Sequence, residues 1–197
     1  MHNLDKNVLI DWHGHNDRGL GVVNALVAAI AGADQIHGTA LGVGERCGNA
    51  AMDQILVNLR LMGVIDNDLS KLATYCETVS EAVGIEIPCN YPVVGTDAFR
   101  TATGVHAAAV IKAARHGDDW LEDMIYSAVP ASMIGRQQVI EIGPMSGLSN
   151  VTYWLSQKGI DPDPKLAQKI FDHAKAAKAV LEEAAILKVV EAFKQES

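Results

Sequence analysis

The chain has 197 residues, of which 49% are hydrophobic and 20% are charged, and its formal net charge is −8. This length allows one or two domains with a buried core, and the acidic balance disfavours nucleic acid as a partner. No apolar run reaches the roughly 18 residues of a membrane span, and the first residues lack a signal-peptide pattern, so we expect a cytoplasmic protein without membrane contact. The three cysteines are widely spaced and odd in number, which predicts free thiols in a reducing compartment.

The first third of the chain alternates strand-like and helical patterns. Residues 4–12 contain a short apolar run typical of a buried strand, and residues 36–40 form a second one. Residues 20–30 and 49–62 carry apolar side chains at helical spacing, and a glycine follows each run. This strand-helix-strand-helix order predicts a parallel sheet.

The rest of the chain is predicted to be mostly helical. Two prolines prevent a helix in the linker at residues 87–95, and a second break falls at Asp161-Pro162-Asp163-Pro164. The expected helices cover residues 69–83, 104–114, 120–126, 151–158 and 165–194. We therefore expect an α/β part, residues 1–66, followed by helical subdomains, residues 67–197.

A polar run, Asp11-Trp12-His13-Gly14-His15-Asn16-Asp17, ends the first predicted strand. Side chains at positions i and i+2 of a strand point to the same side, so the imidazoles of His13 and His15 face one space. Barrels of the (β/α) type place their chemistry at this end of a strand. Two imidazoles there suit a divalent cation such as zinc, manganese or cobalt, whereas the alternative is a polar turn whose histidines cap backbone groups.

A glycine-rich turn, Gly42-Val43-Gly44-Glu45-Arg46-Cys47-Gly48-Asn49-Ala50, follows the second predicted strand. Two successive strand ends with such polar groups favour a functional site over a chance pattern. Glu45 either takes part in catalysis or forms an ion pair with Arg46 that shapes the turn. Asn49 is also placed to cap the following helix.

The two runs together, His-x-His-Asn-Asp and Gly-x-Gly-Glu-Arg-x-Gly-Asn, resemble the 2-isopropylmalate synthase and homocitrate synthase family. Its members are metal-using, acyl-CoA-dependent condensing enzymes with a TIM barrel. The resemblance covers essentially the whole chain and implies that residues 1–66 are the last two β/α units of the barrel. It also implies that His13 and His15 are metal ligands and that Asn49 lies at or beside the metal, which is zinc, manganese, cobalt or magnesium. The family's Asp-Arg-Glu motif, which supplies a third ligand and a catalytic arginine, does not occur in this sequence.

Two further matches lie in the helical part. His106, which follows Thr103-Gly104-Val105, matches a histidine that the family presents to the active site of the partner subunit, so it is a candidate acid or base. Tyr126 matches the tyrosine of the same subdomain and is a second catalytic candidate. The alternatives are a surface histidine at a helix start and an ordinary half-buried aromatic.

The run Gly143–Val151 resembles the family's Gly-x-x-Ser-Gly-x-Ser-Asn-Val signature. Leu148 stands where a lysine or arginine is frequent, which weakens the expectation of an ionic contact at this position. The remaining histidines belong to no motif and are interpreted as structural or solvated: His2, His37, His116 and His173.

The resemblance implies condensation of acetyl-CoA with a 2-oxo acid. We expect the isopropylmalate type, and hence a role in leucine biosynthesis, with the homocitrate and citramalate types as alternatives. A lyase that runs the reverse cleavage and a non-catalytic assembly or regulatory subunit that keeps the motifs are the competing classes. The helical part with its Gly-His run favours the synthase.

Two strands cannot close a barrel, and a two-stranded parallel sheet leaves both edges unpaired. We therefore expect a partner chain that supplies the first part of the barrel, and a homo- or hetero-oligomer with exchanged helical subdomains. The other expected partners are small-molecule substrates. In this interpretation the chain is the small subunit of a split enzyme and is inactive alone.

Overall fold

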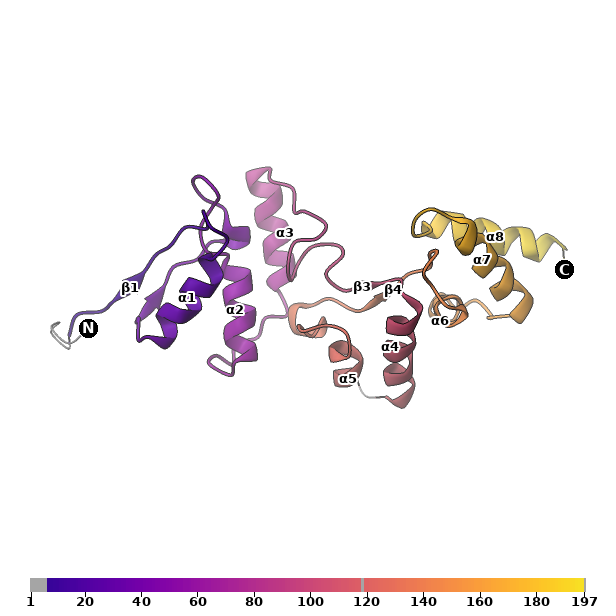
Figure 1. The fold of residues 1–197 in the computed structure, drawn as a ribbon, viewed down its shortest axis with the longest axis horizontal. Coiled ribbons are helices and arrows are strands. Elements are labelled where there is room, and N and C mark those ends of the chain that lie inside the picture. Colours follow the sequence, from indigo (N-terminus) through magenta and orange to yellow (C-terminus); the bar gives the residue numbers. More distant parts are fainter. Residues whose placement is uncertain (1–6, 118, 197) are drawn as a thin grey trace. The chain divides into compact units, whose positions relative to one another are not determined.

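The computed structural model describes residues 7–117 and 119–196, and the chain divides into two compact units. The first unit comprises Met1–Ala98 and Ser132–Gly135, and the second comprises Phe99–Ala131 and Arg136–Ser197. Figure 1 labels the elements in chain order. Both predicted β/α units fall within the first unit, as does the helix that follows them.

The first unit begins with the predicted strand-helix-strand-helix order, which the structure confirms. Its elements are β1 (Asp11–Trp12), α1 (Gly21–Ile30), β2 (Gln35–Ile36), the 3-10 turn η1 (Ala40–Gly42), α2 (Met52–Leu61), α3 (Leu72–Val83) and the 3-10 turn η2 (Ser132–Ile134). Strands β1 and β2 pair in parallel, with Asp11 beside Gln35 and Trp12 beside Ile36. Both strands are shorter than predicted, and residues 4–6 of the first prediction lie outside the described residues.

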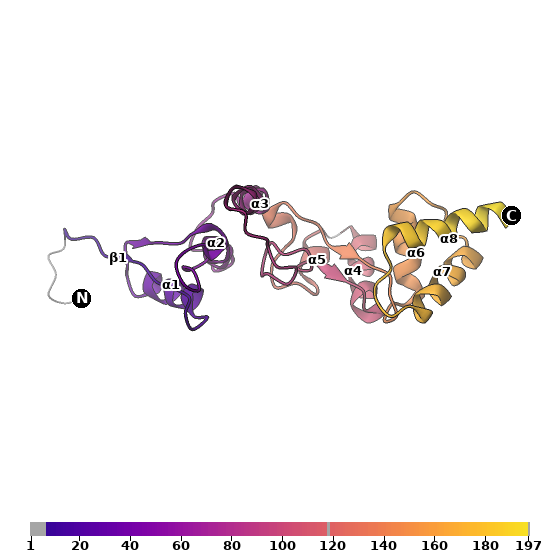
Figure 2. The same cartoon turned by 90° about the horizontal axis from the view of Figure 1, so that it is seen from above.

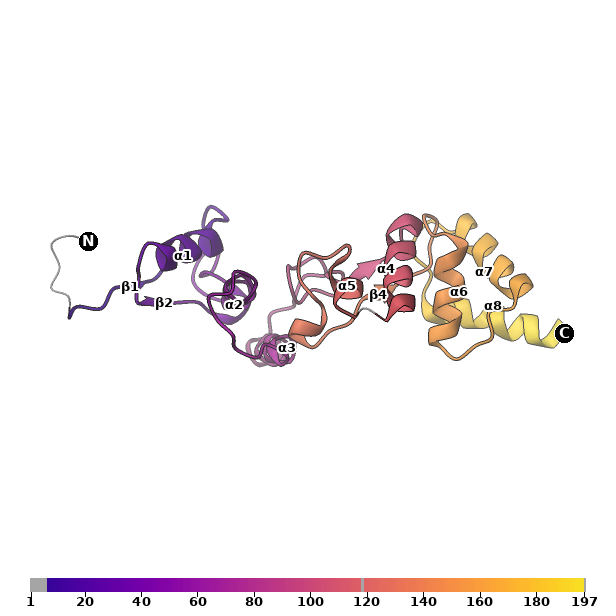
Figure 3. The ribbon, with the colours of Figure 1, turned by 90° about the horizontal axis from the view of Figure 1, so that it is seen from below.

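Helices α1 and α2 lie side by side, as Figures 1 and 3 show. Ala25, Ala50 and Ile55 are buried between them, and the edges of this small core are covered by Trp12, Val22, Leu26, Ile36 and Leu59. Val8 and Leu9, which precede β1 and fall within the strand predicted over residues 4–12, are 51% and 65% exposed, so the predicted burial of this segment is not found within the described chain. A strand can bury both faces only where neighbours cover each of them.

The second unit contains a short parallel strand pair and two groups of helices. Its elements are β3 (Arg100–Thr101), α4 (Gly104–His116), α5 (Asp119–Met124), β4 (Val139–Ile140), α6 (Leu148–Gln157), α7 (Pro164–Ala176) and α8 (Glu183–Glu196). Helix α4 packs against α5 and α6, and α6, α7 and α8 lie together, as Figure 2 shows. These last three helices enclose a hydrophobic core. That core contains Ile142, Val151, Leu155, Leu166, Ala167, Ile170, Ala174, Ile186 and Val190. The sequence did not predict β3 and β4, because two-residue strands carry no periodic signal.

The single helix predicted over residues 165–194 is wrong, since the chain forms α7 and α8 with a break between them. No proline or glycine causes this break. Ala177 leaves the helix with an extended ψ of 156°, and the Leu181 amide donates to the Ile142 carbonyl. Tertiary packing therefore overrides helix propensity here, because turning back lets Ile186 and Val190 join the core beside α7.

Among residues 7–117 and 119–196, no helix combines the length and apolar character needed to cross a bilayer.

Candidate metal centre

His13 and His15 lie just beyond β1, and their imidazoles converge as predicted. The ring centroids are 5.2 Å apart and the ring planes are nearly perpendicular, at 87°. His15 Nδ1 is buried and has no hydrogen-bond partner among the described residues. This nitrogen therefore caps no backbone group, which favours the ligand interpretation of His15 over the polar turn.

Asn49 lies beside His15, although the two residues are far apart in the sequence. They form an antiparallel bridge, in which the Ala50 amide donates to the Gly14 carbonyl at 3.1 Å and the Asn16 amide donates to the Gly48 carbonyl at 2.9 Å. Asn49 does not cap the following helix, because the N-cap of α2 is Ala51. That alternative is wrong, and the side chain of Asn49 is free for another role.

The amide of Asn49 is held in one orientation by its own loop. Its Nδ2 donates to the Val43 carbonyl at 3.3 Å, and Oδ1 is buried without a hydrogen-bond partner among the described residues. A buried polar atom left unpaired costs about 1–3 kcal/mol, so it marks a place where a missing partner would be stabilising. Asn49 Oδ1 and His15 Nδ1 are two such atoms at one site.

These donors suit a borderline divalent cation, for which imidazole nitrogen and amide oxygen are ordinary ligands. The described part of the chain contains no group of three or more His, Cys, Asp or Glu side chains that could hold a metal ion. His13, His15 and Asn49 therefore fit a cation as a partial ligand set. The remaining positions need oxygen ligands from outside these residues.

The glycines of the second motif make room for Asn49. A Cβ at Gly44 would lie 2.4 Å from Asn49 Nδ2, and a Cβ at Gly48 would lie 2.0 Å from the Gly42 carbonyl oxygen. Gly48 also has a φ of +86°, which side chains other than glycine rarely adopt. The loop thus wraps closely around the amide, and this close approach explains why the motif is rich in glycine.

Arg46 pairs with Asp17 of the first motif, and the predicted Glu45–Arg46 pair is wrong. Arg46 Nε donates to Asp17 Oδ1 at 2.7 Å, and Nη2 donates to Oδ2 at 3.1 Å. This bidentate contact lowers the pKa of Asp17 and raises the pKa of Arg46. Arg46 reaches Asp17 with a left-handed backbone, φ 58°, whereas the neighbouring Glu45 is an exposed residue of the loop. The pair joins the two motif loops at their exposed rim.

Asp53 stabilises the loop of the second motif, and it was not predicted from the sequence. It is fully buried in the first turn of α2, and its Oδ1 accepts a hydrogen bond from the Leu41 amide at 2.8 Å. Leu41 has a φ of 56°, so this contact holds a strained residue of η1 in place. Burial raises the pKa of Asp53, and it raises the pKa of the Cys76 thiol to about 12. A signal for Asp53 was present in the sequence, since an acidic residue stands close to Ile55 and Val57, which are buried on the same helix.

His37, which belongs to neither motif and was interpreted as structural or solvated, lies beside His13. It directly follows β2, its amide donates to the Trp12 carbonyl at 2.9 Å, and its ring centroid is 5.8 Å from that of His13. Its Nε2 is 3.8 Å from Asp11 Oδ2. The parallel register explains the proximity, because Trp12 pairs with Ile36 and the next residues of both strands therefore adjoin.

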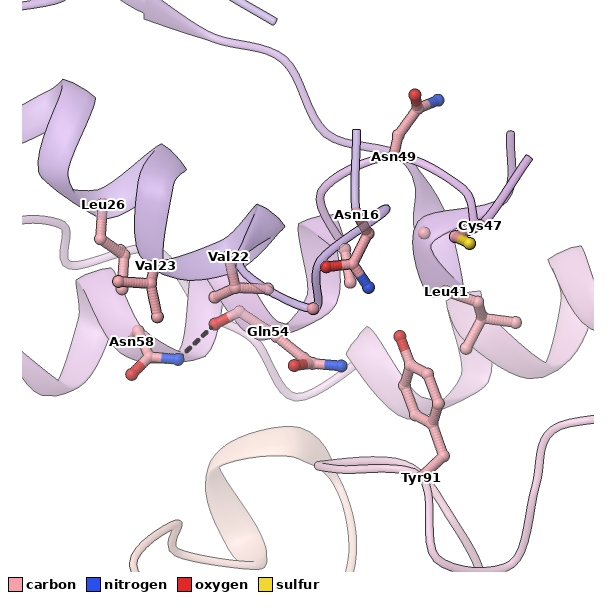
Figure 4. A pocket seen from close by; sticks show the side chains of 13 residues that line it. Asn16, Val22, Val23, Leu26, Leu41, Cys47, Asn49, Gln54, Asn58 and Tyr91 are labelled. Atoms are coloured by element: carbon pink, nitrogen blue, oxygen red, sulfur yellow. Dashed lines mark hydrogen bonds between the residues drawn. The ribbon is translucent and has the colours of Figure 1, made fainter. Parts of the chain in front are cut away.

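A pocket of about 330 Å³ is lined in part by residues of the second motif. Figure 4 shows the side chains that line it. Its polar lining consists of neutral groups, which include Asn16, Gln54, Asn58 and the Tyr91 hydroxyl, and its apolar lining comes mainly from α1. The Asn16 side chain also accepts a hydrogen bond from the Gly21 amide at 2.9 Å, which fixes the start of α1. The pocket shares Asn49 with the candidate metal centre.

In the second unit the structure brings His106 and Tyr126 together. Their rings stack with centroids 4.2 Å apart and an interplanar angle of 30°. His106 lies in the first turn of α4 and is exposed, and Tyr126 follows α5 and is half-exposed. An exposed imidazole and phenol in contact form a suitable acid–base pair, and their catalytic role remains a prediction.

Comparisons with known proteins identify relatives of this chain, and the range that matches a family model contains both motifs. Residues 1–79 match the family model described as HMGL-like. The chain is 37% identical over 193 residues to the (R)-citramalate synthase of Aquifex aeolicus, covering 90% of this chain and 35% of that protein. It is 34% identical over 169 residues to the homocitrate synthase AksA of Methanopyrus kandleri, covering 85% of this chain and 40% of the relative. It is 35% identical over 181 residues to the 2-isopropylmalate synthase of Acetivibrio thermocellus, covering 89% and 34% respectively. The chain therefore spans between about a third and two fifths of the length of these relatives.

Proposed function

We propose that this protein takes part in a metal-dependent condensation of acetyl-CoA with a 2-oxo acid. The premise is that residues 1–79 match the HMGL-like family and that the chain is similar to three kinds of synthase. The observation that carries the proposal is the convergence of two imidazoles and an unpartnered amide oxygen at the joined ends of the two motifs. Buried polar atoms without partners cost stability, so two of them at one site favour a bound group there over motifs that merely persist in a non-catalytic subunit.

The reaction assigns distinct tasks to the residues. A base removes a proton from the acetyl methyl group, the resulting carbon forms a bond to the keto carbon of the 2-oxo acid, and the keto oxygen gains a proton. Water then cleaves the thioester and releases the CoA thiol. His13, His15 and Asn49 would hold a divalent cation, which supplies Lewis-acid polarisation of the keto group when bound.

The proton transfers fall to His106 and Tyr126 in this proposal. The imidazole of His106 can take or give a proton, and the stacked phenol of Tyr126 restricts the orientation of the ring. Because both side chains are exposed in the described chain, they are accessible to the active site of another copy. Exchange of helical parts between subunits would bring them there.

The preferred 2-oxo acid is that of the isopropylmalate type, on the likeness of the second motif and the helical region. The citramalate type is the second candidate, since the Aquifex relative of that name is 37% identical. The homocitrate type follows from the Methanopyrus relative. These three activities differ in the side chain of the 2-oxo acid and share the same bond-forming step.

We further propose that strands from outside the described residues complete the sheet and the metal centre. Among the described residues of the first unit, one pair of strands forms the sheet, and Val8 and Leu9 remain exposed beside it. Additional parallel strands would cover these side chains, and carboxylates on those strands would complete the ligand set.

The test compares the chain alone with the chain co-expressed with a protein that carries the first six β/α units of a relative's barrel. Release of CoA thiol is measured with acetyl-CoA and, in turn, 2-oxoisovalerate, pyruvate or 2-oxoglutarate. We expect activity in the complex with one of these acids and none without a 2-oxo acid. An active preparation of the 197-residue chain alone would contradict the need for additional strands. A well-folded, metal-loaded complex that is inactive with every 2-oxo acid would contradict the proposed reaction.

A further inference from the structure

We propose that Ser146 and Asn150 form a clamp that sets the position of His106. In this proposal the signature run Gly143–Val151 fixes the start of α4, and thereby the position of His106 beside Tyr126. The chemical importance of His106 rests on the proposed function, whereas the clamp itself rests on contacts within the second unit.

Both side chains are polar and almost completely buried, with 2% and 0% exposure. Ser146 Oγ donates to the Ala102 carbonyl at 2.7 Å and accepts from the Gly143 amide at 2.8 Å. Asn150 Nδ2 donates to the Ala102 and Glu141 carbonyls at 3.3 and 3.0 Å, and its Oδ1 accepts from the Gly147 amide at 3.1 Å. Ser146 and Asn150 thus donate hydrogen bonds to carbonyls of two separate segments, at Ala102 and Glu141.

The two carbonyls lie where the short strands end. β3 and β4 pair over only two residues each, and the pairing stops after the Glu141 amide donates to the Thr101 carbonyl at 2.9 Å. Ala102 and Glu141 come next in their segments and have no further sheet partner within the described ladder. The side chains of the clamp therefore supply the hydrogen bonds that a longer β-ladder would give these two carbonyls, and they keep both segments together beyond the strands.

The clamp is continuous with the first turn of α4. The N-cap residue, Thr103, makes no side-chain capping bond, so the turn lacks its usual local stabilisation. Instead the Gly104 amide donates to the Met145 carbonyl at 3.0 Å, and a Cβ at Gly104 would lie 2.7 Å from the Gly147 nitrogen. The backbone of the signature run thus supports the helix end that carries His106.

The opposite side of the clamp is attached to α7. Lys175 Nζ donates to the carbonyls of Pro144 and Ser146, each at 2.8 Å. The ammonium also lies 4.9 Å from the centroid of the Phe171 ring, on the same helix. Contacts therefore run from α7 through residues 144–150 to the start of α4.

The test measures the accessibility of His106 in the full protein, assembled with its barrel partner where one is needed. Diethylpyrocarbonate labelling is followed by mass spectrometry, and the labelling rate of His106 is divided by that of His116. His116 is an exposed residue at the far end of the same helix, so it reports general loosening of α4. Tyr126→Ala, which removes the stacked ring, provides the ratio expected for a fully released imidazole.

Ser146→Ala and Asn150→Asp should each raise this ratio several-fold, toward the Tyr126→Ala value. Ser156→Ala is the matched control, because it removes a hydroxyl from α6, the helix that carries Asn150, and this hydroxyl donates to the Thr152 carbonyl, at 2.9 Å, outside the clamp. It should leave the ratio unchanged. Lys175→Met, which alters an exposed side chain, provides a milder variant should the buried substitutions prevent folding, and it should raise the ratio less.

An unchanged ratio in the folded Ser146→Ala, Asn150→Asp and Lys175→Met proteins would overturn the clamp. An equal rise at His106 and His116 would also overturn it, because it would show general loosening of the helix. Since labelling requires no turnover, these outcomes are independent of whether the proposed condensation is correct.

Discussion

Asn49 lies opposite His15 in an antiparallel bridge, so the amide of the second motif is held beside the imidazole of the first. Hydrogen bonds between the backbones of the two segments fix this juxtaposition, and the Arg46–Asp17 ion pair joins the same segments at the rim. The two motifs therefore form one structural unit. Substitutions that separate the two motifs should therefore weaken cation binding more than they lower the stability of the fold.

The first prediction concerns the imidazoles. His13→Ala and His15→Ala should each abolish tight binding of a divalent cation, because each removes one of the few ligands that this chain supplies. Metal analysis of the assembled protein should show about one cation per site in the parent protein and loss in both variants. His173→Ala, a substitution on α7 in the other unit, is the control. Full metal content in His13→Ala would remove that residue from the ligand set.

The second prediction concerns the space around the amide. Gly44→Ala should weaken cation binding by about 10-fold or more, since the added methyl would lie 2.4 Å from Asn49 Nδ2 and must displace the side chain. Glu45→Ala is the neighbouring control and should keep the cation, because Glu45 is exposed in the same loop. Isothermal titration with Zn²⁺ or Mn²⁺ would measure both. Equal affinity in the two variants would mean that the position of Asn49 does not matter.

The third prediction concerns Asp53. Asp53→Ala should lower the free energy of unfolding by about 1–3 kcal/mol, because it leaves the partly buried Leu41 amide without its acceptor. Asp53→Asn keeps an acceptor and should be tolerated. Chemical denaturation of the parent protein and both variants would test this difference. Similar losses in Asp53→Ala and Asp53→Asn would show that the negative charge, and not the acceptor, is required.

Asp53 also predicts a pH dependence of stability. Burial raises the pKa of this carboxyl in the folded state, so the folded protein binds the proton more tightly than the unfolded chain does. The contribution of Asp53 to stability is therefore fully present below the pKa of the unfolded chain, and it declines as the pH rises through the folded-state pKa. Denaturation curves at acidic and neutral pH should show this decline in the parent protein, and Asp53→Asn should reduce it.

The fourth prediction concerns the exchange of helical parts between subunits. If His106 acts in the active site of another copy, mixing inactive His15→Ala and His106→Ala complexes should restore part of the activity, because hybrids contain one intact site. Thiol release after mixing measures the recovery, and differently tagged subunits verify that hybrids form. The absence of activity in verified hybrids would place His106 in the site of its own chain or outside catalysis.

Sequence alone was sufficient for the elements that rest on local signals. The helices at residues 20–30 and 104–114 were predicted from apolar spacing and are found as α1 and α4 with small shifts at their ends. The convergence of the His13 and His15 imidazoles was predicted from strand alternation and is found, although both residues lie just beyond β1. The residue types of the motifs likewise indicated a relation to isopropylmalate and homocitrate synthases, and the comparisons find relatives of both names and of citramalate synthase.

Only the tertiary structure decided which distant residues meet. The partner of Arg46 is Asp17 and not its neighbour Glu45, because two separate loops converge where the backbones pair. His37 lies beside His13 through strand register, and Ser146 reaches Ala102 across the sheet end. The break between α7 and α8 has the same origin, since packing against a shared core outweighs local helix propensity. Such contacts depend on the whole arrangement of the chain, and the local sequence around each residue does not encode them.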